Sequence, residues 1–327
     1  MDRDGAGDKR EGIVIRSQSG FCTVLCDGRE YLCQLRGRLK QGKRRSHTVA
    51  VAGDRVAFRP VADAGSDTRS GVVEEVLPRA NKISRTSSRR DSGRTEQVLM
   101  ANLDQIVVVQ SVCQPAPMSG FVDRLLAASA RYGVAGLLCV NKIDLDAAAA
   151  GDARWDYYAT IGYCLLRTSA ETGDGVDAFH DALLGRITLL LGASGTGKSA
   201  LLARATGLDL EIGDVTEKTG LGRHTTTRTE LFPIGDGGFI ADSPGIRGFE
   251  PWDVEPVELR TLFPDFLTPA GDCRFATCVH RDEPGCGIKR AVRDGELPAW
   301  RHEAYLLILG ALETREAERG PRRRKKE

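Results

Sequence analysis

One glycine-rich stretch constrains this chain more than any other, the sequence GASGTGKS at 192–199. It fits the pattern G-x-x-x-x-G-K-S, follows the apolar run 187–191 and precedes a segment typical of a helix at 200–205. A strand, a glycine-rich turn and a helix in this order are the context in which the pattern forms a phosphate-binding loop. The glycines let backbone N–H groups close around phosphate oxygens, and the helix N-terminus adds the positive end of its dipole. The sequence therefore predicts a domain that binds a nucleoside triphosphate.

Two side chains of this loop have predicted roles beside the phosphates. Lys198 is expected to reach the β- and γ-phosphates, and the Ser199 hydroxyl is expected to bind Mg²⁺. The loop alone does not specify the base. The predicted phosphate-binding residues are Gly192, Ala193, Ser194, Gly195, Thr196, Gly197, Lys198 and Ser199.

Composition excludes some classes of protein. The chain has 327 residues, 41% hydrophobic and 28% charged, as expected for a soluble protein with more than one domain. Because it has no run of about 18 apolar residues, no membrane span is predicted. The polar N-terminus lacks the apolar core of a signal peptide, so the nine cysteines indicate reduced thiols and a cytoplasmic location.

The net charge is only +1, but basic residues are concentrated in three segments. They crowd 36–45, 85–94 and 322–326. Separated basic patches suit a polyanion such as RNA. Any one of them taken alone is equally well explained as a solvated loop.

Short strand-like runs separated by turn residues follow a tail at 1–10 that is predicted to be disordered. They predict a small β-barrel of the oligonucleotide-binding (OB) type at 11–78, although an SH3-like barrel would give a similar pattern. In an OB-type barrel, the basic loop at 36–45 would face nucleic acid. The runs are 13–15, 21–25, 31–35, 54–58 and 71–76.

After an Arg- and Ser-rich segment at 79–97, predicted to be a basic linker, strands and helices alternate. The continuous β-branched run at 105–109 is typical of a buried strand, and 121–132 has the periodicity of an amphipathic helix. The alternation predicts a parallel sheet covered on both faces, in a domain at 98–249. Further strands are predicted at 136–140, 163–166, 187–191 and 239–241, and helices near 154–158 and 176–184.

Two short motifs at predicted strand ends specify the base. The sequence NKID occupies 141–144, and the pair SA occupies 169–170 after the next strand. The Asp144 carboxylate can accept hydrogen bonds from guanine N1–H and N2–H₂, a donor pair that adenine lacks. Asn141 is expected to brace the loop, and the Lys142 stem to cover the ring face. The predicted guanine-binding residues are Asn141, Lys142, Ile143, Asp144, Ser169 and Ala170.

Two further segments supply the remaining parts of a GTPase. The sequence DSPG at 242–245 is a D-x-x-G motif, which places Asp242 near Mg²⁺ and the Gly245 N–H near the γ-phosphate. Between it and the phosphate loop, GRHTTT at 222–227 can supply the threonine that closes over Mg²⁺. The candidates for that threonine are Thr225 and Thr226.

The order of these motifs is permuted. Ordinary GTPases have the phosphate loop, the switch threonine, D-x-x-G, N-K-x-D and S-A in this order, whereas here the last two come first. A circular permutation retains the sheet if the old termini are joined and a new opening is made. The D-x-x-G switch then leads directly into the C-terminal region.

A cluster of cysteine and histidine follows the permuted domain, with the spacing C-x4-C-x-H-x5-C. Three thiolates and one imidazole predict one closed structural Zn²⁺ site without an open catalytic position. The segment 250–319 is therefore predicted to be a zinc-binding, mostly helical domain. It is expected to contain a helix at 300–318 and to be followed by a basic tail at 320–327. The predicted ligands are Cys273, Cys278, His280 and Cys286.

The barrel, the permuted motifs GLGRHTTT and DSPGIR, and the cysteine and histidine spacing together resemble the ribosome small subunit-dependent GTPase A (RsgA/YjeQ) family, from about Gly12 to Glu318. The resemblance implies a monomeric, cytoplasmic GTPase that binds GTP and GDP, with Mg²⁺ and one Zn²⁺. It also implies binding to the small ribosomal subunit and its rRNA late in assembly, and release upon GTP hydrolysis.

The resemblance further implies His224 as the catalytic residue. Ile246 stands where Ras-like enzymes carry the glutamine that orients the attacking water, so another group must act. Alternatively, His224 only packs within the switch.

Two other functions are compatible with the motifs. One is a GTP-gated regulator that binds RNA or the ribosome and for which hydrolysis is incidental. The other is a GTPase that acts on a protein partner, which leaves the barrel and the basic patches unexplained.

Overall fold

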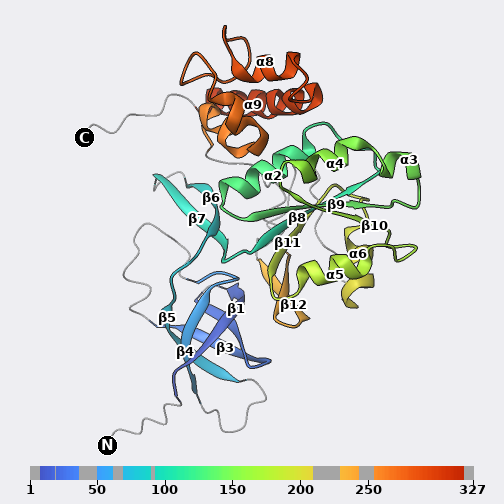
Figure 1. Ribbon diagram of the computed structural model, residues 1–327. Helices are drawn as coiled ribbons and strands as arrows, with labels where there is room; N and C mark the ends of the chain where they lie inside the picture. Colours follow the sequence, from blue (N-terminus) through green and yellow to red (C-terminus); the bar gives the residue numbers. More distant parts are fainter. Residues whose placement is uncertain are drawn as a thin grey trace, which may run out of the picture.

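The computed structural model describes residues 8–18, 20–36, 50–61, 69–89, 93–208, 229–242 and 254–319. These residues form an N-terminal barrel, a central α/β domain and a C-terminal helical domain, which follow one another along the molecule (Figure 1). This arrangement confirms the predicted multidomain fold class. None of the described helices combines the length and the apolar character that a membrane crossing requires.

Strand pairing closes the N-terminal barrel, and its side chains alternate between the core and the outer surface. Adjacent strands are antiparallel except β3 and β5, and pairing of β1 with β4 closes the ring in the order 1-2-3-5-4-1. Inward residues such as Val24, Cys33 and Phe58 form its core. Each expected run overlaps one strand, which confirms the OB-like barrel. The strands are β1 (Arg10–Gln18), β2 (Phe21–Cys26), β3 (Arg29–Leu35), β4 (Arg55–Val61) and β5 (Ser70–Val76).

The limits of the barrel differ slightly from the prediction. Because β1 begins at Arg10 and residues 8 and 9 precede it, the tail predicted at 1–10 is too long. Residues 1–7 and most of the basic loop predicted at 36–45 lie outside the described residues.

The central sheet has the order β10-β9-β8-β11-β13-β12. All neighbours are parallel except β12, which pairs antiparallel with β13 and meets β1 of the barrel at one position, Arg16 opposite Glu230. The two central strands, β8 and β11, are buried along their whole length. The strands are β8 (Gln105–Ser111), β9 (Ala135–Asn141), β10 (Cys164–Thr168), β11 (Ile187–Leu191), β12 (Glu230–Gly235) and β13 (Gly238–Asp242).

Helices cover both faces of this sheet, as its β-branched strands require. On β8, Ile106 and Val108 pack with α2 and α4, whereas Val107 and Val109 pack with α5 and α6. Figure 1 shows the two helical layers on opposite sides of the strands. The helices are α2 (Phe121–Arg131), α3 (Ala147–Ala150), α4 (Ala153–Thr160), α5 (Val176–Leu183) and α6 (Lys198–Thr206).

The linker predicted at 79–97 is wrong. β6 (Lys82–Arg89) and β7 (Gly93–Ala101) pair as an antiparallel two-stranded sheet. Ile83 and Met100 are buried in the core that also contains α2, because the base of the hairpin turns apolar side chains toward it. This burial fixes the hairpin against the central α/β domain in spite of its Arg- and Ser-rich composition.

The C-terminal domain is mostly helical and has a core of its own. Phe263, Phe266 and Tyr305 pack together at its centre. The helix predicted at 300–318 is confirmed, and the basic tail at 320–327 lies outside the described residues. The elements are η2 (Pro256–Leu262), η3 (Pro264–Phe266), α7 (Leu267–Ala270), α8 (Gly287–Arg293) and α9 (Ala299–Arg319).

A buried ion pair fixes the chain where it leaves the barrel. Arg79 Nε and a terminal guanidinium nitrogen donate to the two Asp54 carboxylate oxygens at 2.7 and 2.8 Å. The Asp54 side chain is fully buried and that of Arg79 is 16% exposed. Asp54 also accepts a hydrogen bond from the backbone N–H of Val51. The pair thus joins the barrel to the segment that enters β6.

Replacing Arg79 by Met is expected to lower the free energy of unfolding by about 3 kcal/mol, because the buried Asp54 carboxylate loses its bidentate partner. Urea unfolding followed by circular dichroism measures the change. The control is Lys9→Met, which breaks the exposed pair of Lys9 with Glu75 and is expected to cost less than about 1 kcal/mol. Equal losses in the two variants would contradict a structural role for the buried pair.

Candidate nucleotide site and metal centre

The predicted phosphate loop connects β11 to α6 at the carboxyl end of the parallel sheet. Gly195 and Gly197 have φ of +79° and +89°, in the left-handed region that favours glycine. A Cβ on Gly192 would lie 2.4 Å from the Val109 carbonyl oxygen, and one on Gly197 would lie 2.5 Å from Asn141 Nδ2. These glycines therefore let the loop pass against the ends of β8 and β9.

Lys198 begins α6 and bends back over the loop. Its side-chain Nζ donates to the carbonyl oxygens of Ala193 and Gly192 at 2.8 and 3.1 Å. Ser194 and Gly195 are exposed, whereas Lys198 is buried. The ammonium group thus lies inside a loop whose rim is open to a ligand, as the pairing of lysine with a phosphate requires.

Asn141, at the end of β9, joins the two predicted motifs. Its Nδ2 donates to the Thr196 carbonyl oxygen at 2.9 Å, and its Oδ1 accepts from Thr168 Oγ1 at 3.0 Å. The side chain is fully buried. Because β9 lies between β8 and β10, this amide connects the phosphate loop with the end of β10.

Asp144 and Ser169 meet across the ends of β9 and β10. Ser169 Oγ donates to Asp144 Oδ1 at 2.5 Å, and the Thr172 N–H donates to Ser169 Oγ at 3.0 Å. The backbone N–H of Ile143 donates to the Thr168 carbonyl oxygen at 3.3 Å. Asp144 is exposed, so its carboxylate can reach a ligand. The structure therefore brings the N-K-x-D and S-A motifs together beside the phosphate loop.

Lys142 has a partner that the sequence analysis missed. The residue has φ of +62°, and its Nζ donates to the Gln114 carbonyl oxygen at 2.7 Å. Gln114 lies in the loop 112–120 between β8 and α2, and Ser111 Oγ accepts from its N–H at 3.1 Å. No side-chain pattern could have identified this contact, because a backbone carbonyl has no sequence signature.

Asp242 ends β13, next to the strand that leads into the phosphate loop. Pairing of Leu189 with Ala241 places the Asp242 backbone beside the end of β11. This is where an aspartate near Mg²⁺ is expected. The other predicted switch residues lie outside the described residues: His224, Thr225, Thr226 and Gly245.

The four predicted metal ligands converge in the C-terminal domain. Their ligand atoms all lie within 4.8 Å of one another. His280 Nδ1 lies 3.5 Å from Cys273 Sγ and 3.4 Å from Cys286 Sγ. Cys278 and His280 are buried, and the Gly287 N–H donates to Cys273 Sγ at 3.3 Å. Three sulfurs and one imidazole nitrogen so arranged could hold a tetrahedral metal ion.

Electrostatics and loop geometry suit this set of donors. Burial lowers the pKa of His280 to about 4, so the imidazole is neutral, as a ligand must be. Burial raises the pKa of Cys278 to about 12, which means that metal binding would displace its proton. Glu283 shapes the loop between the ligands, because its carboxylate accepts hydrogen bonds from the N–H groups of Val279 and Arg281.

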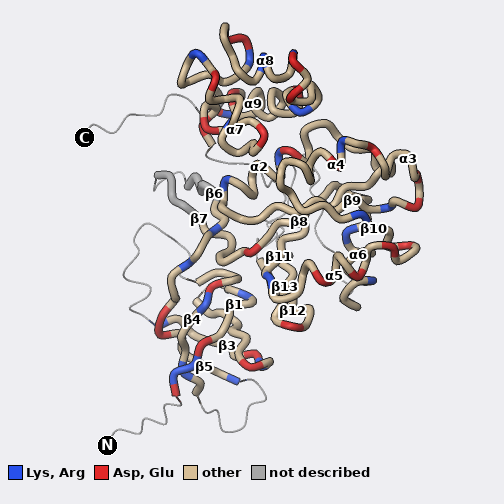
Figure 2. The backbone as a smooth tube through the Cα atoms, in the orientation of Figure 1, with Lys and Arg blue, Asp and Glu red and all other residues tan. Residues whose placement is uncertain are grey.

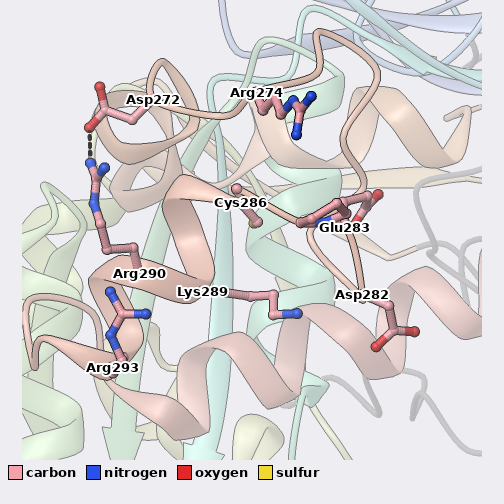
Figure 3. Close-up of a pocket in the computed structure, with 10 residues that line it drawn as sticks. Asp272, Arg274, Asp282, Glu283, Cys286, Lys289, Arg290 and Arg293 are labelled. Atoms are coloured by element: carbon pink, nitrogen blue, oxygen red, sulfur yellow. Dashed lines mark hydrogen bonds and ion pairs between the residues drawn. The ribbon is translucent and has the colours of Figure 1, made fainter.

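A cavity of about 530 Å³ opens beside this cluster. Basic side chains from α8 and the preceding loop line it, including Arg274, Lys289 and Arg293, together with Cys286 (Figure 3). Asp282 and Glu283 also line the cavity, and Asp272 pairs with Arg290. The cavity therefore carries mixed charge.

Two family models and many curated proteins match this chain. The family described as RsgA GTPase matches residues 76–252, and the RsgA N-terminal domain matches residues 11–66. The small ribosomal subunit biogenesis GTPase RsgA of Moorella thermoacetica is 37% identical over 307 residues, which are 94% of this chain and 98% of that protein. The protein of the same name from Yersinia enterocolitica is 35% identical over 321 residues, 96% and 88% of the two chains.

Solved structures give the same result. YjeQ from Thermotoga maritima superposes with a TM-score of 0.73 at 32% identity, covering 93% of this chain and 98% of that one. YloQ, described as a circularly permuted GTPase, superposes with a TM-score of 0.72 at 26% identity, covering 98% and 100%. The motif order, the two convergent sites and these matches over nearly the whole chain lead to one assignment: the protein is a GTPase of the RsgA family.

Proposed function

We propose that this protein binds the small ribosomal subunit and hydrolyses GTP during late maturation of that subunit, with turnover stimulated by the ribosomal particle. The observation that carries the proposal is the match, over 94% of the chain, to a small ribosomal subunit biogenesis GTPase. The convergence of the phosphate and guanine motifs on one edge of the sheet supports it, because these parts are what GTP binding requires.

Each predicted residue has a proposed role in binding GTP. Lys198 and the loop N–H groups bind the phosphates. The Asp144 carboxylate accepts hydrogen bonds from guanine N1–H and N2–H₂, and Ser169 holds that carboxylate in place. Mg²⁺, which GTPases of this family use with GTP, neutralises charge on the phosphates when bound. Ser199, Asp242 and either Thr225 or Thr226 are the residues proposed to lie around it, and Gly245 approaches the γ-phosphate.

His224 is proposed to orient the attacking water. Ile246 has no polar atom on its side chain, so it cannot perform the task of the Ras-like glutamine. Turnover of the free protein is therefore expected to be slow, and binding to the subunit is proposed to stimulate it. Under this proposal, GTP hydrolysis leads to release of the protein from the subunit.

The rRNA contacts are proposed to involve the barrel and the C-terminal domain. Figure 2 shows Lys and Arg interspersed with Asp and Glu along both described regions, so neither region forms a purely basic surface there. The basic segments 36–45 and 322–326, which lie mostly or wholly outside the described residues, are therefore the stronger candidates. We place the protein in the cytoplasm as a monomer, with the predicted domain limits retained apart from the shorter N-terminal tail and the segment that forms β6 and β7.

One structural Zn²⁺ is proposed at the cysteine and histidine cluster. The donors present are the soft sulfur and imidazole ligands that Zn²⁺ takes in closed sites, and four protein ligands leave no position for catalysis. When bound, the ion supplies cross-links to a small domain. The role of Cys273, Cys278, His280 and Cys286 is therefore to fix the loop between α7 and α8.

Single-turnover GTP hydrolysis with and without purified small subunits tests the function. The proposal predicts at least a tenfold faster rate with subunits, roughly 1.4 kcal/mol of the barrier. Large subunits serve as the control particle, and added salt is expected to weaken the stimulation steeply because phosphate contacts release counterions. GTP-dependent subunit binding without faster hydrolysis would instead favour a regulator in which hydrolysis is incidental.

Replacing His224 by Ala is expected to reduce the subunit-stimulated rate about a hundredfold, the lower range for loss of a group that acts on the reacting water. GTP affinity measured by fluorescence titration is expected to stay within about twofold, since the substituted side chain is proposed to meet water and not the nucleotide. Full stimulated turnover in this variant would remove His224 from the mechanism.

Replacing Cys286 by Ser is expected to abolish binding of Zn²⁺, measured as metal per chain by mass spectrometry, and to reduce helical circular dichroism from the C-terminal domain. GDP binding is expected to persist, because the nucleotide motifs lie in another domain. The matched control is Cys164→Ser, at an exposed cysteine outside the cluster. One Zn²⁺ per chain retained by Cys286→Ser would contradict the predicted ligand set.

A further inference from the structure

A buried arginine joins the C-terminal domain to the GTPase domain. Arg301, in the first turn of α9, is only 1% exposed. Its Nε and one terminal nitrogen donate to the two oxygens of Asp265 in η3, at 2.9 and 3.0 Å. The other terminal nitrogen donates to Asp123 Oδ1, in the first turn of α2. The guanidinium therefore connects a carboxylate of each domain.

Aromatic residues of α4 complete this group. Tyr158 OH donates to Asp123 Oδ1 at 2.9 Å, and Tyr157 OH donates to Asp265 Oδ2 at 3.0 Å. The Trp300 ring lies against both tyrosines, with centroids 5.5 and 5.8 Å apart. We call these five polar residues the Arg301 cluster: Asp123, Tyr157, Tyr158, Asp265 and Arg301.

The Arg301 cluster is costly to separate. Burial raises the pKa of Asp123 in spite of the neighbouring guanidinium, which shows how strongly this carboxylate is desolvated. Removing one partner of such a buried group leaves an uncompensated charge, whereas in the intact group Asp123 Oδ1 and both oxygens of Asp265 accept hydrogen bonds. The start of α2 is thus held in one place by the C-terminal domain.

The segment that enters α2 reaches the nucleotide site. At its end, Gly120 faces α9, where an added Cβ would lie 3.6 Å from the Ala304 carbonyl oxygen. Near its beginning, the Gln114 carbonyl oxygen accepts the hydrogen bond from Lys142 Nζ. The next residue, Pro115, lies 3.6 Å from where a Cβ on Gly195 of the phosphate loop would stand. One loop, 112–120, therefore lies beside α9 and the phosphate loop and is hydrogen-bonded to the guanine motif.

We propose that Arg301 is a positioning residue for the nucleotide site. By fixing the first turn of α2, it holds the loop 112–120 so that the Gln114 carbonyl seats Lys142 over the guanine position. The inference rests on the guanine-binding role proposed for Lys142. Through these contacts the C-terminal domain is coupled to the guanine-binding part of the site. This coupling is separate from the covalent connection of the two domains through the D-x-x-G switch. A partner that binds the C-terminal domain would thereby change the dissociation rate of the bound nucleotide.

The test measures dissociation of a fluorescent GDP derivative, chased with unlabelled GDP, from the full-length protein. Arg301→Met is expected to accelerate dissociation about fivefold or more, the lower end of typical coupling between sites. Lys142→Met is expected to accelerate it as well. In the double variant, the dissociation rate is expected to stay within about twofold of that of Lys142→Met, because both substitutions disrupt the same interaction, the contact of Lys142 with the Gln114 carbonyl.

If the dissociation rate of the double variant increases by the product of the two single effects, the inference is overturned. Such a result would mean that Arg301→Met acts independently of Lys142, as a general loss of stability would. An unchanged rate in Arg301→Met, with a faster one in Lys142→Met, would also overturn it and leave the guanine assignment intact. An unchanged rate in Lys142→Met would instead remove the guanine role of that lysine, and the coupling with it.

Two variants guard against misfolding. Asp265→Asn keeps the shape of the side chain and leaves the hydrogen bond of Arg301 to Asp123. It is expected to accelerate GDP dissociation less than Arg301→Met does. If Arg301→Met does not fold, this variant decides the question by the same double-variant comparison. Arg290→Met breaks the exposed pair of Arg290 with Asp272 in the same domain and is expected to leave the dissociation rate unchanged.

Discussion

The contact between the Asn141 amide and the Thr196 carbonyl holds the nucleotide site together. It joins motifs that lie 55 residues apart in the chain. Strand pairing alone would not bring these two residues together, because β9 and β11 are separated by β8 in the sheet. The phosphate loop must cross the end of β8 to meet Asn141, and Gly192 and Gly197 permit that close approach. Permutation of the chain leaves this geometry unchanged, since it depends on neighbouring strand ends and not on their order in the sequence.

Permutation does change how the other domains attach. The barrel precedes β8 and also meets the sheet at its β12 edge, while the C-terminal domain follows β13 and packs against α2. Each flanking domain therefore has a covalent connection and a second, noncovalent one. For the C-terminal domain, the noncovalent connection is the Arg301 cluster. Under the proposed site assignments, the C-terminal domain is therefore connected to the γ-phosphate end of the site through the chain and to the guanine end through α2.

Sequence patterns predicted the parts of this protein whose physics is local. Continuous apolar runs identified β8 and β11, and fixed spacings located the candidate phosphate loop, guanine motif and four metal donors that the fold brings together. The hairpin of β6 and β7 was missed because a few buried residues, such as Ile83, outweigh a polar composition. Arg301 and the Gln114 carbonyl were missed because their partners lie far away in sequence: Asp123 is 178 residues from Arg301, a distance that no periodicity reports.

The metal cluster and the Arg301 cluster share one aromatic core. The Phe266 ring lies 6.1 Å from the His280 ring and 5.1 Å from that of Phe263, and Phe263 lies under the Arg301 guanidinium at 4.4 Å. In a domain this small, a displaced ring cannot be compensated by other packing. The loop that holds His280 must therefore be in place for Phe263 to support Arg301. Under the proposed Zn²⁺ assignment, loss of the metal is therefore expected to weaken the support of α2 and the loop 112–120, while the nucleotide motifs in the other domain still bind.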